Sequence, residues 1–246
     1  EMQWYAEANG DPKSVTGKPK ALGGLPHELG STGYGVAIAT LTALKHIGKR
    51  PKGTTFAVEG FGNVGMFAIQ HLLDEGMILV AVSDSKGTCI KQQGLRYGKL
   101  LTTKRRRGTV TAYTGAGVAP TQNILLIEAE VLITAAVPDL IHMSDVETMN
   151  YNIIIEGSNI PTTPEVEEAL HKKGILVIPD IIANAGGVIS SYAEWKGIDE
   201  KTMFKLVQEK IVANTQLILR LSTNKRISPR TAAVEIAHRR IEEGKE

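Results

Sequence analysis

Residues 54–65 have the sequence TTFAVEGFGNVG, in which an apolar run passes into a glycine turn of the form Gly60-x-Gly62-x-x-Gly65. A helical pattern follows the turn, and a second apolar run then stops at Asp84. Strand, glycine turn, helix, strand and acid in this order are typical of a dinucleotide-binding unit. Gly60 allows a tight turn, Gly62 lets the backbone approach a pyrophosphate, and Gly65 lets the helix pack closely on the strand.

The start of the helix after this turn is suited to phosphate. Its first N–H groups have no partner within the helix, and the positive end of the helix dipole lies there. Asp84 follows at roughly the 20-residue distance expected of an acid that binds the ribose hydroxyls. The sequence therefore predicts a bound dinucleotide, and the alternative is a glycine turn that binds nothing.

Composition excludes several other classes of protein. The chain has 246 residues and a net charge of +2, which implies neither nucleic acid nor an anionic membrane as a partner. The basic run 104–107 contains no aromatic residues, so we interpret it as a solvated helix end or loop. Cys89 is the only cysteine, which excludes an internal disulfide and a cysteine-based metal site. No apolar run approaches the roughly 20 residues that span a bilayer. We expect a cytoplasmic protein without a bound metal.

Strand-like and helix-like segments alternate along most of the chain. The predicted strands are 54–59, 77–83, 109–113, 131–134, 152–156 and 175–178, and the predicted helices are 31–47, 63–75, 94–104, 124–129, 163–173, 184–195, 200–221 and 228–243. Most of the strands are almost wholly apolar, which predicts a parallel sheet covered on both faces. The expected fold class is therefore α/β, with a Rossmann-like, doubly wound, mostly parallel sheet, flanking helices and a helical C-terminal segment.

The chain is expected to consist of three parts. Residues 1–30 look like a residual linker and helix from a missing N-terminal domain, because a helix-like start is broken at 9–12 by Asn, Gly, Asp and Pro. Residues 31–199 form the predicted dinucleotide-binding domain. Residues 200–246 are expected to be C-terminal helices that pack on or beside it.

Site candidates follow the predicted strands. Ligands of an open parallel sheet lie beyond the carboxyl ends of its strands, and small or polar residues occupy 60–65, 83–86, 135–138 and 157–159. Asn159 can donate and accept hydrogen bonds to a ribose or a carboxamide. The alternative is that Ala135 and Ala136 only pack and that Asn159 is a turn residue.

A further candidate is the small-residue segment 180–188, whose amides suit a carboxylate at a helix start. Ser191 lies one turn into the predicted helix and can add a hydroxyl group there. The alternative is a helix that packs closely through its small residues.

Several segments together resemble the glutamate dehydrogenases of the Glu/Leu/Phe/Val dehydrogenase superfamily. They are VTGKP at 15–19, STGYGV at 31–36, the glycine turn, VAVSDSKG at 80–87, EGSNIPTTP at 156–164, IPDIIANAGGV at 178–188 and SYAEW at 191–195. The resemblance extends from about Val15 to the C-terminus.

The resemblance implies a role for individual residues. Thr32 matches a threonine at the nicotinamide end of the cofactor, although it can also be a helix N-cap. Asp84 matches the position that discriminates at the adenine ribose, and Val188 and Ser191 match substrate contacts. The implied cofactor-binding residues are Thr32, Gly60, Gly62, Asn63, Val64, Gly65, Asp84, Ser85, Lys86, Ala135, Ala136 and Asn159, and the implied substrate-binding residues are Asn184, Val188 and Ser191.

The catalytic residues of the family are absent from this sequence. The family places its catalytic lysine and aspartate in an N-terminal domain, and neither a Gly-Gly-x-Lys-Gly-Gly nor a Pro-Asp-Val-Gly-Thr segment occurs here. Deamination needs such groups to transfer protons. We therefore expect no catalytic residue in this chain, and cofactor binding with little or no turnover.

The resemblance implies the nicotinamide-cofactor-binding domain of an oxidoreductase that reversibly deaminates L-glutamate to 2-oxoglutarate and ammonium. The carboxylate of Asp84 should repel a 2′-phosphate and favour NAD, while Lys86 can offset this and admit NADP. Alternatives are the cofactor domain of a leucine, phenylalanine or valine dehydrogenase, a stand-alone dinucleotide-binding regulatory module, and a remnant that binds nothing. The full-length protein is expected to be a homo-hexamer, and this fragment a monomer or weak dimer.

Overall fold

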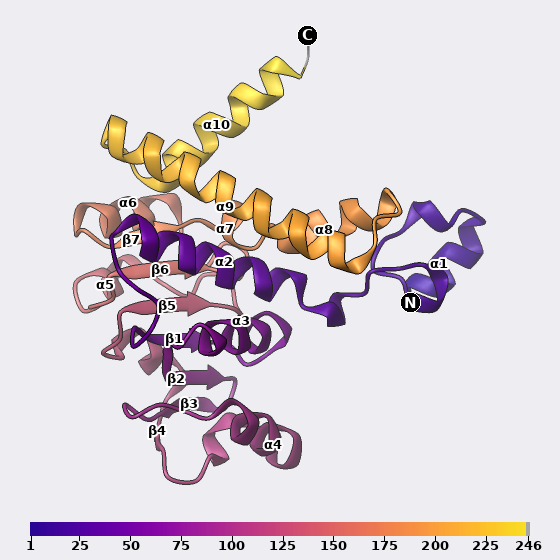
Figure 1. Ribbon diagram of the computed structural model, residues 1–246. Coiled ribbons are helices and arrows are strands. Elements are labelled where there is room, and N and C mark those ends of the chain that lie inside the picture. Colours follow the sequence, from indigo (N-terminus) through magenta and orange to yellow (C-terminus); the bar gives the residue numbers. More distant parts are fainter. Residues whose placement is uncertain (245–246) are drawn as a thin grey trace.

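A computed structural model describes residues 1–244, and within them the strands form one seven-stranded sheet in the order β4–β3–β2–β1–β5–β6–β7 (Figure 1). The strands are β1 Thr55–Glu59, β2 Ile78–Asp84, β3 Gly87–Ile90, β4 Gly117–Ala119, β5 Val131–Thr134, β6 Ile153–Glu156 and β7 Leu176–Ile178. The five strands from β2 to β7 in this order pair in parallel, whereas β3 and β4 are antiparallel at one edge. The predicted Rossmann-like, mostly parallel sheet is confirmed.

Helices cover both faces of the sheet because its strands are apolar on both sides. The α-helices are α1 Met2–Asn9, α2 Ser31–His46, α3 Asn63–Asp74, α4 Tyr97–Arg107, α5 Met143–Val146, α6 Pro164–Lys172, α7 Asp180–Ala183, α8 Gly186–Trp195, α9 Glu200–Lys225 and α10 Pro229–Glu243. Phe56 and Val58 belong to the core beneath α2, α3 and α9, whereas Ala57 belongs to the core beneath α5 and α6. Alternate residues of a strand point to opposite faces, which accounts for this division.

The antiparallel edge was not predicted. The segment 109–113, expected to be a strand, contains a 3-10 helix at Val110–Ala112, because the Thr109 side chain accepts a hydrogen bond from the N–H of Thr111 and starts a turn. The helix expected at 124–129 is a 3-10 helix at Thr121–Leu126. Gly87 has φ +147, and a Cβ atom there would lie 2.8 Å from the Ala119 carbonyl oxygen. The close approach of β4 to β3 therefore depends on glycine at this position.

The N-cap of α2 and the start of α8 also differ from the prediction. Thr32 does not cap α2, because the helix begins at Ser31 and its N-cap is Gly30, which has φ +77 and no capping side chain. A Cβ atom on Gly30 would lie 2.2 Å from the ring of Phe67 on α3, so glycine also lets the two helices approach. The helix expected at 184–195 is α8, which begins two residues later at Gly186, and the short helix α7 before it was not predicted.

The N-terminal segment is attached to α8 by one buried carboxylate. Glu194 accepts hydrogen bonds from the N–H groups of Gly17 at 2.8 Å and Leu25 at 2.7 Å, and it forms an ion pair with Lys18. Burial alone would raise the pKa of Glu194, but these hydrogen bonds and the Lys18 charge hold the pKa below its usual value.

At the other end of the chain, α9 packs along α2, and α10 contacts α9 before it projects away from the body (Figure 1). The division of the chain into the three parts 1–30, 31–199 and 200–246 stays a prediction. Residues 245–246 of the third part lie outside the described range. None of the described helices is both long enough and apolar enough to cross a membrane.

Candidate functional site

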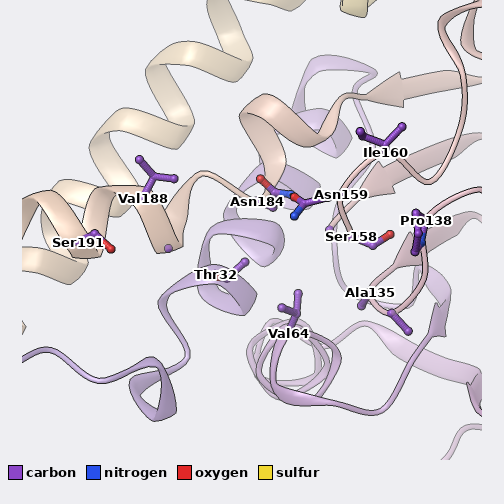
Figure 2. A pocket seen from close by; sticks show the side chains of 13 residues that line it. Thr32, Val64, Ala135, Pro138, Ser158, Asn159, Ile160, Asn184, Val188 and Ser191 are labelled. Carbon is purple, nitrogen blue, oxygen red and sulfur yellow. The ribbon is translucent and has the colours of Figure 1, made fainter. Parts of the chain in front are cut away.

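A pocket of about 720 Å³ lies where the parallel strands end (Figure 2). In the sheet, β1 lies between β2 and β5, so the strand order reverses direction at β1. Ligands of doubly wound sheets bind at such a reversal of strand order. The start of α2, the start of α3, the loops after β5, β6 and β7, and α8 together enclose the pocket. Its lining residues are Thr32, Val64, Ala135, Ala136, Pro138, Gly157, Ser158, Asn159, Ile160, Asn184, Gly187, Val188 and Ser191.

The three glycines of the turn after β1 differ in what surrounds them. Gly60 has φ +98, and a Cβ atom there would lie 2.7 Å from the Cβ of Ala136. A Cβ atom on Gly65 would lie 2.1 Å from the Gly60 carbonyl oxygen, so the close packing of helix on strand requires glycine. A Cβ atom on Gly62 would meet nothing within 4 Å. The middle glycine therefore faces open space at the start of α3, where a phosphate group fits.

Many of the predicted site residues meet at the pocket, although they are far apart in sequence. Thr32 from α2 and Val64 from α3 point into the space between the two helices, and Ala135 faces them from the loop after β5 (Figure 2). Asn159 and Asn184 lie side by side above them. The residues brought together at the pocket are Thr32, Val64, Ala135, Ala136, Asn159, Asn184, Val188 and Ser191.

The two asparagines join neighbouring loops. The Nδ2 of Asn184 donates a hydrogen bond to the Oδ1 of Asn159 at 2.7 Å. Each amide group has both a donor and an acceptor, so the pair leaves the Nδ2 of Asn159 and the Oδ1 of Asn184 without a side-chain partner among residues 1–244. These two atoms suit the hydroxyl and carboxamide groups expected of a ribose and a nicotinamide.

The loop that follows β5 is supported by a residue that the sequence reasoning missed. Glu59, the last residue of β1, accepts hydrogen bonds from the N–H groups of Ala135 and Ala136, each at 3.0 Å. Burial raises the pKa of the Glu59 carboxyl, against the opposing effect of these hydrogen bonds. The signal was present in the sequence, because a glutamate that ends an apolar strand needs hydrogen-bond donors once it is buried.

Asp84 is placed at the end of β2, as predicted, but its carboxylate is occupied. Its Oδ1 accepts hydrogen bonds from the N–H of Lys86 at 2.9 Å and the hydroxyl of Thr109 at 3.1 Å. Its Oδ2 accepts from the Nζ of Lys104 at 2.7 Å and the N–H of Val110 at 2.8 Å. A carboxylate has about four acceptor positions, so a ribose hydroxyl would have to displace one of these groups.

The charge of Asp84 is also balanced. Burial alone would raise its pKa, but the hydrogen bonds from Lys104, Lys86 and Val110 hold the pKa below its usual value. Lys104 is therefore more than a solvated residue at a helix end, which corrects the interpretation of the basic run for this residue. Ser85 and Lys86, at the tip of the β2–β3 hairpin, are exposed.

Not all of the predicted residues line the pocket. Those outside its lining are Gly60, Gly62, Asn63, Gly65, Asp84, Ser85 and Lys86. Asn63, in the first turn of α3, donates a side-chain hydrogen bond to the His27 carbonyl oxygen at 3.2 Å. Val188 and Ser191 belong to α8 and line the pocket, and Val188 is 74% exposed. Ile160 was not singled out from the sequence, and it lines the pocket with a left-handed φ of 49.

The chain is similar to known proteins over most of its length. Residues 23–246 match the Glutamate/Leucine/Phenylalanine/Valine dehydrogenase family. A glutamate dehydrogenase of Aeropyrum pernix is 40% identical over 195 residues, which are 77% of this chain and 47% of that protein. An NADP(+)-dependent glutamate dehydrogenase of Pyrobaculum calidifontis is 36% identical over 170 residues, 67% of this chain and 40% of that protein. The chain therefore belongs to the Glu/Leu/Phe/Val dehydrogenase family, as its sequence motifs predicted.

A solved structure supports the same conclusion. The hetero-hexameric glutamate dehydrogenase of Thermus thermophilus, in its leucine-bound form, has a TM-score of 0.88 and 27% identity. The match covers 98% of this chain and 59% of that one. The chain thus spans less than half of the curated relatives it matches and over half of the solved chain.

Proposed function

We propose that this chain binds a nicotinamide dinucleotide across the pocket. The diphosphate lies at the N-terminus of α3 against Gly60, Gly62 and Val64, and the nicotinamide end lies among Thr32, Ala135 and Asn159. The observation that supports this best is the open space at Gly62, because it adjoins two glycines whose surroundings are closed. Asn63, Gly65 and Ala136 complete the proposed cofactor contacts.

For the complete enzyme, we propose the reversible oxidative deamination of L-glutamate to 2-oxoglutarate and ammonium. The bound cofactor would accept or return a hydride at its nicotinamide ring. Asn184, Val188 and Ser191 would contact the amino-acid substrate at the open side of the pocket. The chain itself contributes binding and orientation, and the proton-transfer groups belong to the rest of the enzyme.

Two other functions remain alternatives. One is the same cofactor role in a leucine, phenylalanine or valine dehydrogenase, and the other is a dinucleotide-binding regulatory module. We propose a cytoplasmic protein whose full-length form is a homo-hexamer, whereas the present chain alone is a monomer or weak dimer.

Both NAD and NADP are proposed ligands. The preference for NAD was predicted because the carboxylate of Asp84 should repel a 2′-phosphate, and that carboxylate is paired with Lys104. Ser85 and Lys86 are exposed beside it and can reach a ribose hydroxyl or a 2′-phosphate. A relative described as NADP(+)-dependent supports the inclusion of NADP.

Titration of the chain with NADH and with NADPH tests this proposal. We expect at least one of them to bind saturably, as measured by the change in nicotinamide fluorescence. We also expect little or no oxidation of L-glutamate by the chain alone. Absence of saturable binding up to about 1 mM, a free energy of about 4 kcal/mol, would contradict the proposal. Turnover comparable to that of a complete dehydrogenase would contradict the assignment of the proton-transfer groups to the rest of the enzyme.

A further inference from the structure

A buried cluster of charged groups lies behind the pocket wall formed by residues 157–160. Three carboxyl groups surround one guanidinium, and each of the four residues belongs to a different element. Glu156 ends β6, Glu167 belongs to α6, Asp180 begins α7 and Arg230 belongs to α10. The side chains of Glu156, Glu167 and Asp180 are 0%, 2% and 8% exposed, and that of Arg230 is 18% exposed.

Arg230 contacts all three carboxyl groups. Its Nη2 lies 2.8 Å from the Oε2 of Glu156 and 2.6 Å from the Oε1 of Glu167, and its Nη1 lies 2.8 Å from the Oδ1 of Asp180. If all three carboxyl groups were ionised, one positive charge would face three negative charges in a buried site. Uncompensated buried charge is costly, and a group in this situation usually becomes neutral.

The hydroxyl of Thr162 indicates which carboxyl group is neutral. Its oxygen lies 2.9 Å from the Oε1 of Glu156 and 3.4 Å from the Oε1 of Glu167. A hydroxyl has one proton to donate, so it cannot donate to both oxygens. If the Oε1 of Glu156 is protonated, Glu156 donates to Thr162 and Thr162 donates to Glu167, and both contacts become hydrogen bonds.

The other oxygen of Glu156 is arranged as an acceptor. Its Oε2 accepts hydrogen bonds from Arg230 at 2.8 Å and from the N–H of Asp180 at 3.0 Å. A neutral carboxyl group has one donor oxygen and one acceptor oxygen, which matches this pattern. Burial, and then the neighbouring charge of Glu167, raise the pKa of Glu156 to about 8 against the opposing effect of Arg230.

The same cluster fixes both loops that hold the pocket asparagines. Glu156 directly precedes the pocket wall, and the Oδ2 of Asp180 accepts a hydrogen bond from the N–H of Ile160 in that wall at 2.9 Å. The carbonyl oxygen of Asp180 accepts one from the N–H of Asn184 at 3.0 Å. The cluster therefore lies between α10 and the groups that contact the proposed ligand.

We propose that Glu156 and Arg230 are positioning residues of the coenzyme pocket, and that the Glu156 carboxyl is neutral at pH 7 and donates a hydrogen bond to the hydroxyl of Thr162. The part of this inference that concerns coenzyme affinity rests on the proposed function. Loss of the proton leaves a second uncompensated charge facing Glu167 and Asp180, which displaces the loops of Asn159 and Asn184. Coenzyme binding therefore weakens in alkaline solution.

The sign of the effect on stability follows from the raised pKa of Glu156. Its ordinary value is 4.5 and its value in the folded chain is about 8. The neutral carboxyl makes its full contribution to the free energy of unfolding below pH 4.5. This contribution declines as the pH rises to about 8, and it does not change further above that pH. In the folded chain itself, the ionised form becomes the major one above about pH 8.

A Glu156→Gln variant tests the proposal, because its amide nitrogen can donate to Thr162 while its amide oxygen accepts from Arg230. The ligand is whichever of NADH and NADPH binds the wild type more tightly. If only the chain with a neutral Glu156 binds it, its dissociation constant for the wild type should rise about 10-fold from pH 7 to pH 9. The Glu156→Gln variant should fold, bind like the wild type at pH 7 and lose this pH dependence. The matched control is Glu168→Gln, an exposed carboxyl of α6 that is 43% accessible, which should keep the wild-type profile.

The protonation state is measured independently of any coenzyme from the carboxyl carbon resonance of Glu156 as a function of pH. A midpoint near 8 supports the proposal, and a midpoint below 6 overturns it. An unchanged pH profile in Glu156→Gln also overturns it. If neither coenzyme binds the wild type, the proposed function and the positioning role fail together, while the carbon titration still decides whether Glu156 holds the proton.

Discussion

We expect an Arg230→Met variant to lose about 3–5 kcal/mol of unfolding free energy at pH 7. The substitution keeps much of the side-chain volume but removes the guanidinium that contacts Glu156, Glu167 and Asp180. Breaking a buried ion pair by removing one partner is costly because the other charges stay buried without compensation. Domains are typically stable by only about 5–15 kcal/mol, so this one change should remove a large part of the total.

Urea denaturation followed by circular dichroism measures this effect. The matched control is Arg239→Met, on the same helix, where the arginine side chain is 57% exposed and pairs with Glu235 one turn earlier. Exposed pairs of this kind contribute about 0–1 kcal/mol. The Arg230→Met loss should also shrink near pH 5, because the carboxyl groups deprived of the cation take up protons. Equal losses in the two variants would contradict the account of the cluster.

We expect a Gly62→Val variant to weaken coenzyme binding by about 100-fold or more, which corresponds to about 2.8 kcal/mol. Its side chain would occupy the open space at the start of α3 where the diphosphate is proposed to lie. The fold should tolerate the change, because Gly62 has φ −95 and ψ −162, which any residue adopts, and a Cβ atom there meets nothing within 4 Å. Valine is a poor N-cap, so we expect a stability loss of at most about 1 kcal/mol.

The control for this variant is the same change at Gly98, in α4, where a Cβ atom also meets nothing within 4 Å. Gly98→Val should leave coenzyme affinity unchanged. Gly65→Ala is not a suitable control, because its Cβ would collide with the Gly60 carbonyl oxygen and disturb fold and binding together. Coenzyme binding by Gly62→Val with wild-type affinity would show that the diphosphate does not lie at this turn.

The sequence was sufficient to predict the parallel strands and the glycine turn because their signals are local. An apolar run, a glycine at a fixed spacing and a helical pattern lie within one short stretch, and the turn at Gly60 and Gly65 has the geometry expected of it. Ala135 and Asn159 could be assigned to one pocket because parallel strands end at the same edge of a sheet. Thr32 was assigned from the family resemblance instead.

The features that were missed depend on contacts between distant segments. The β3–β4 hairpin is short and has little periodicity, and its formation depends on Gly87 and on the 3-10 helix after Thr109. The spacing between the glycine turn and Asp84 predicted the position of this residue but not its neighbours. Lys104 and Val110, which donate hydrogen bonds to Asp84, are 20 and 26 residues away along the chain.

The buried cluster was missed for the same reason. Arg230 lies 74 residues from Glu156 along the chain and 63 from Glu167. No local pattern relates a helix near the C-terminus to the end of a strand in the middle of the sheet, so only the folded arrangement reveals that these groups share one site.

The backbone amide spectrum of the ¹⁵N-labelled chain, recorded with and without a saturating concentration of NADH or NADPH, tests the central claim most directly. The account predicts that the amide resonances of Gly60, Gly62 and Val64 shift strongly, together with the side-chain amide resonances of Asn159 and Asn184. The amide resonance of Gly98 should stay unchanged. Saturating coenzyme that shifts resonances elsewhere, and leaves those of the glycine turn and the two asparagines in place, would contradict the account.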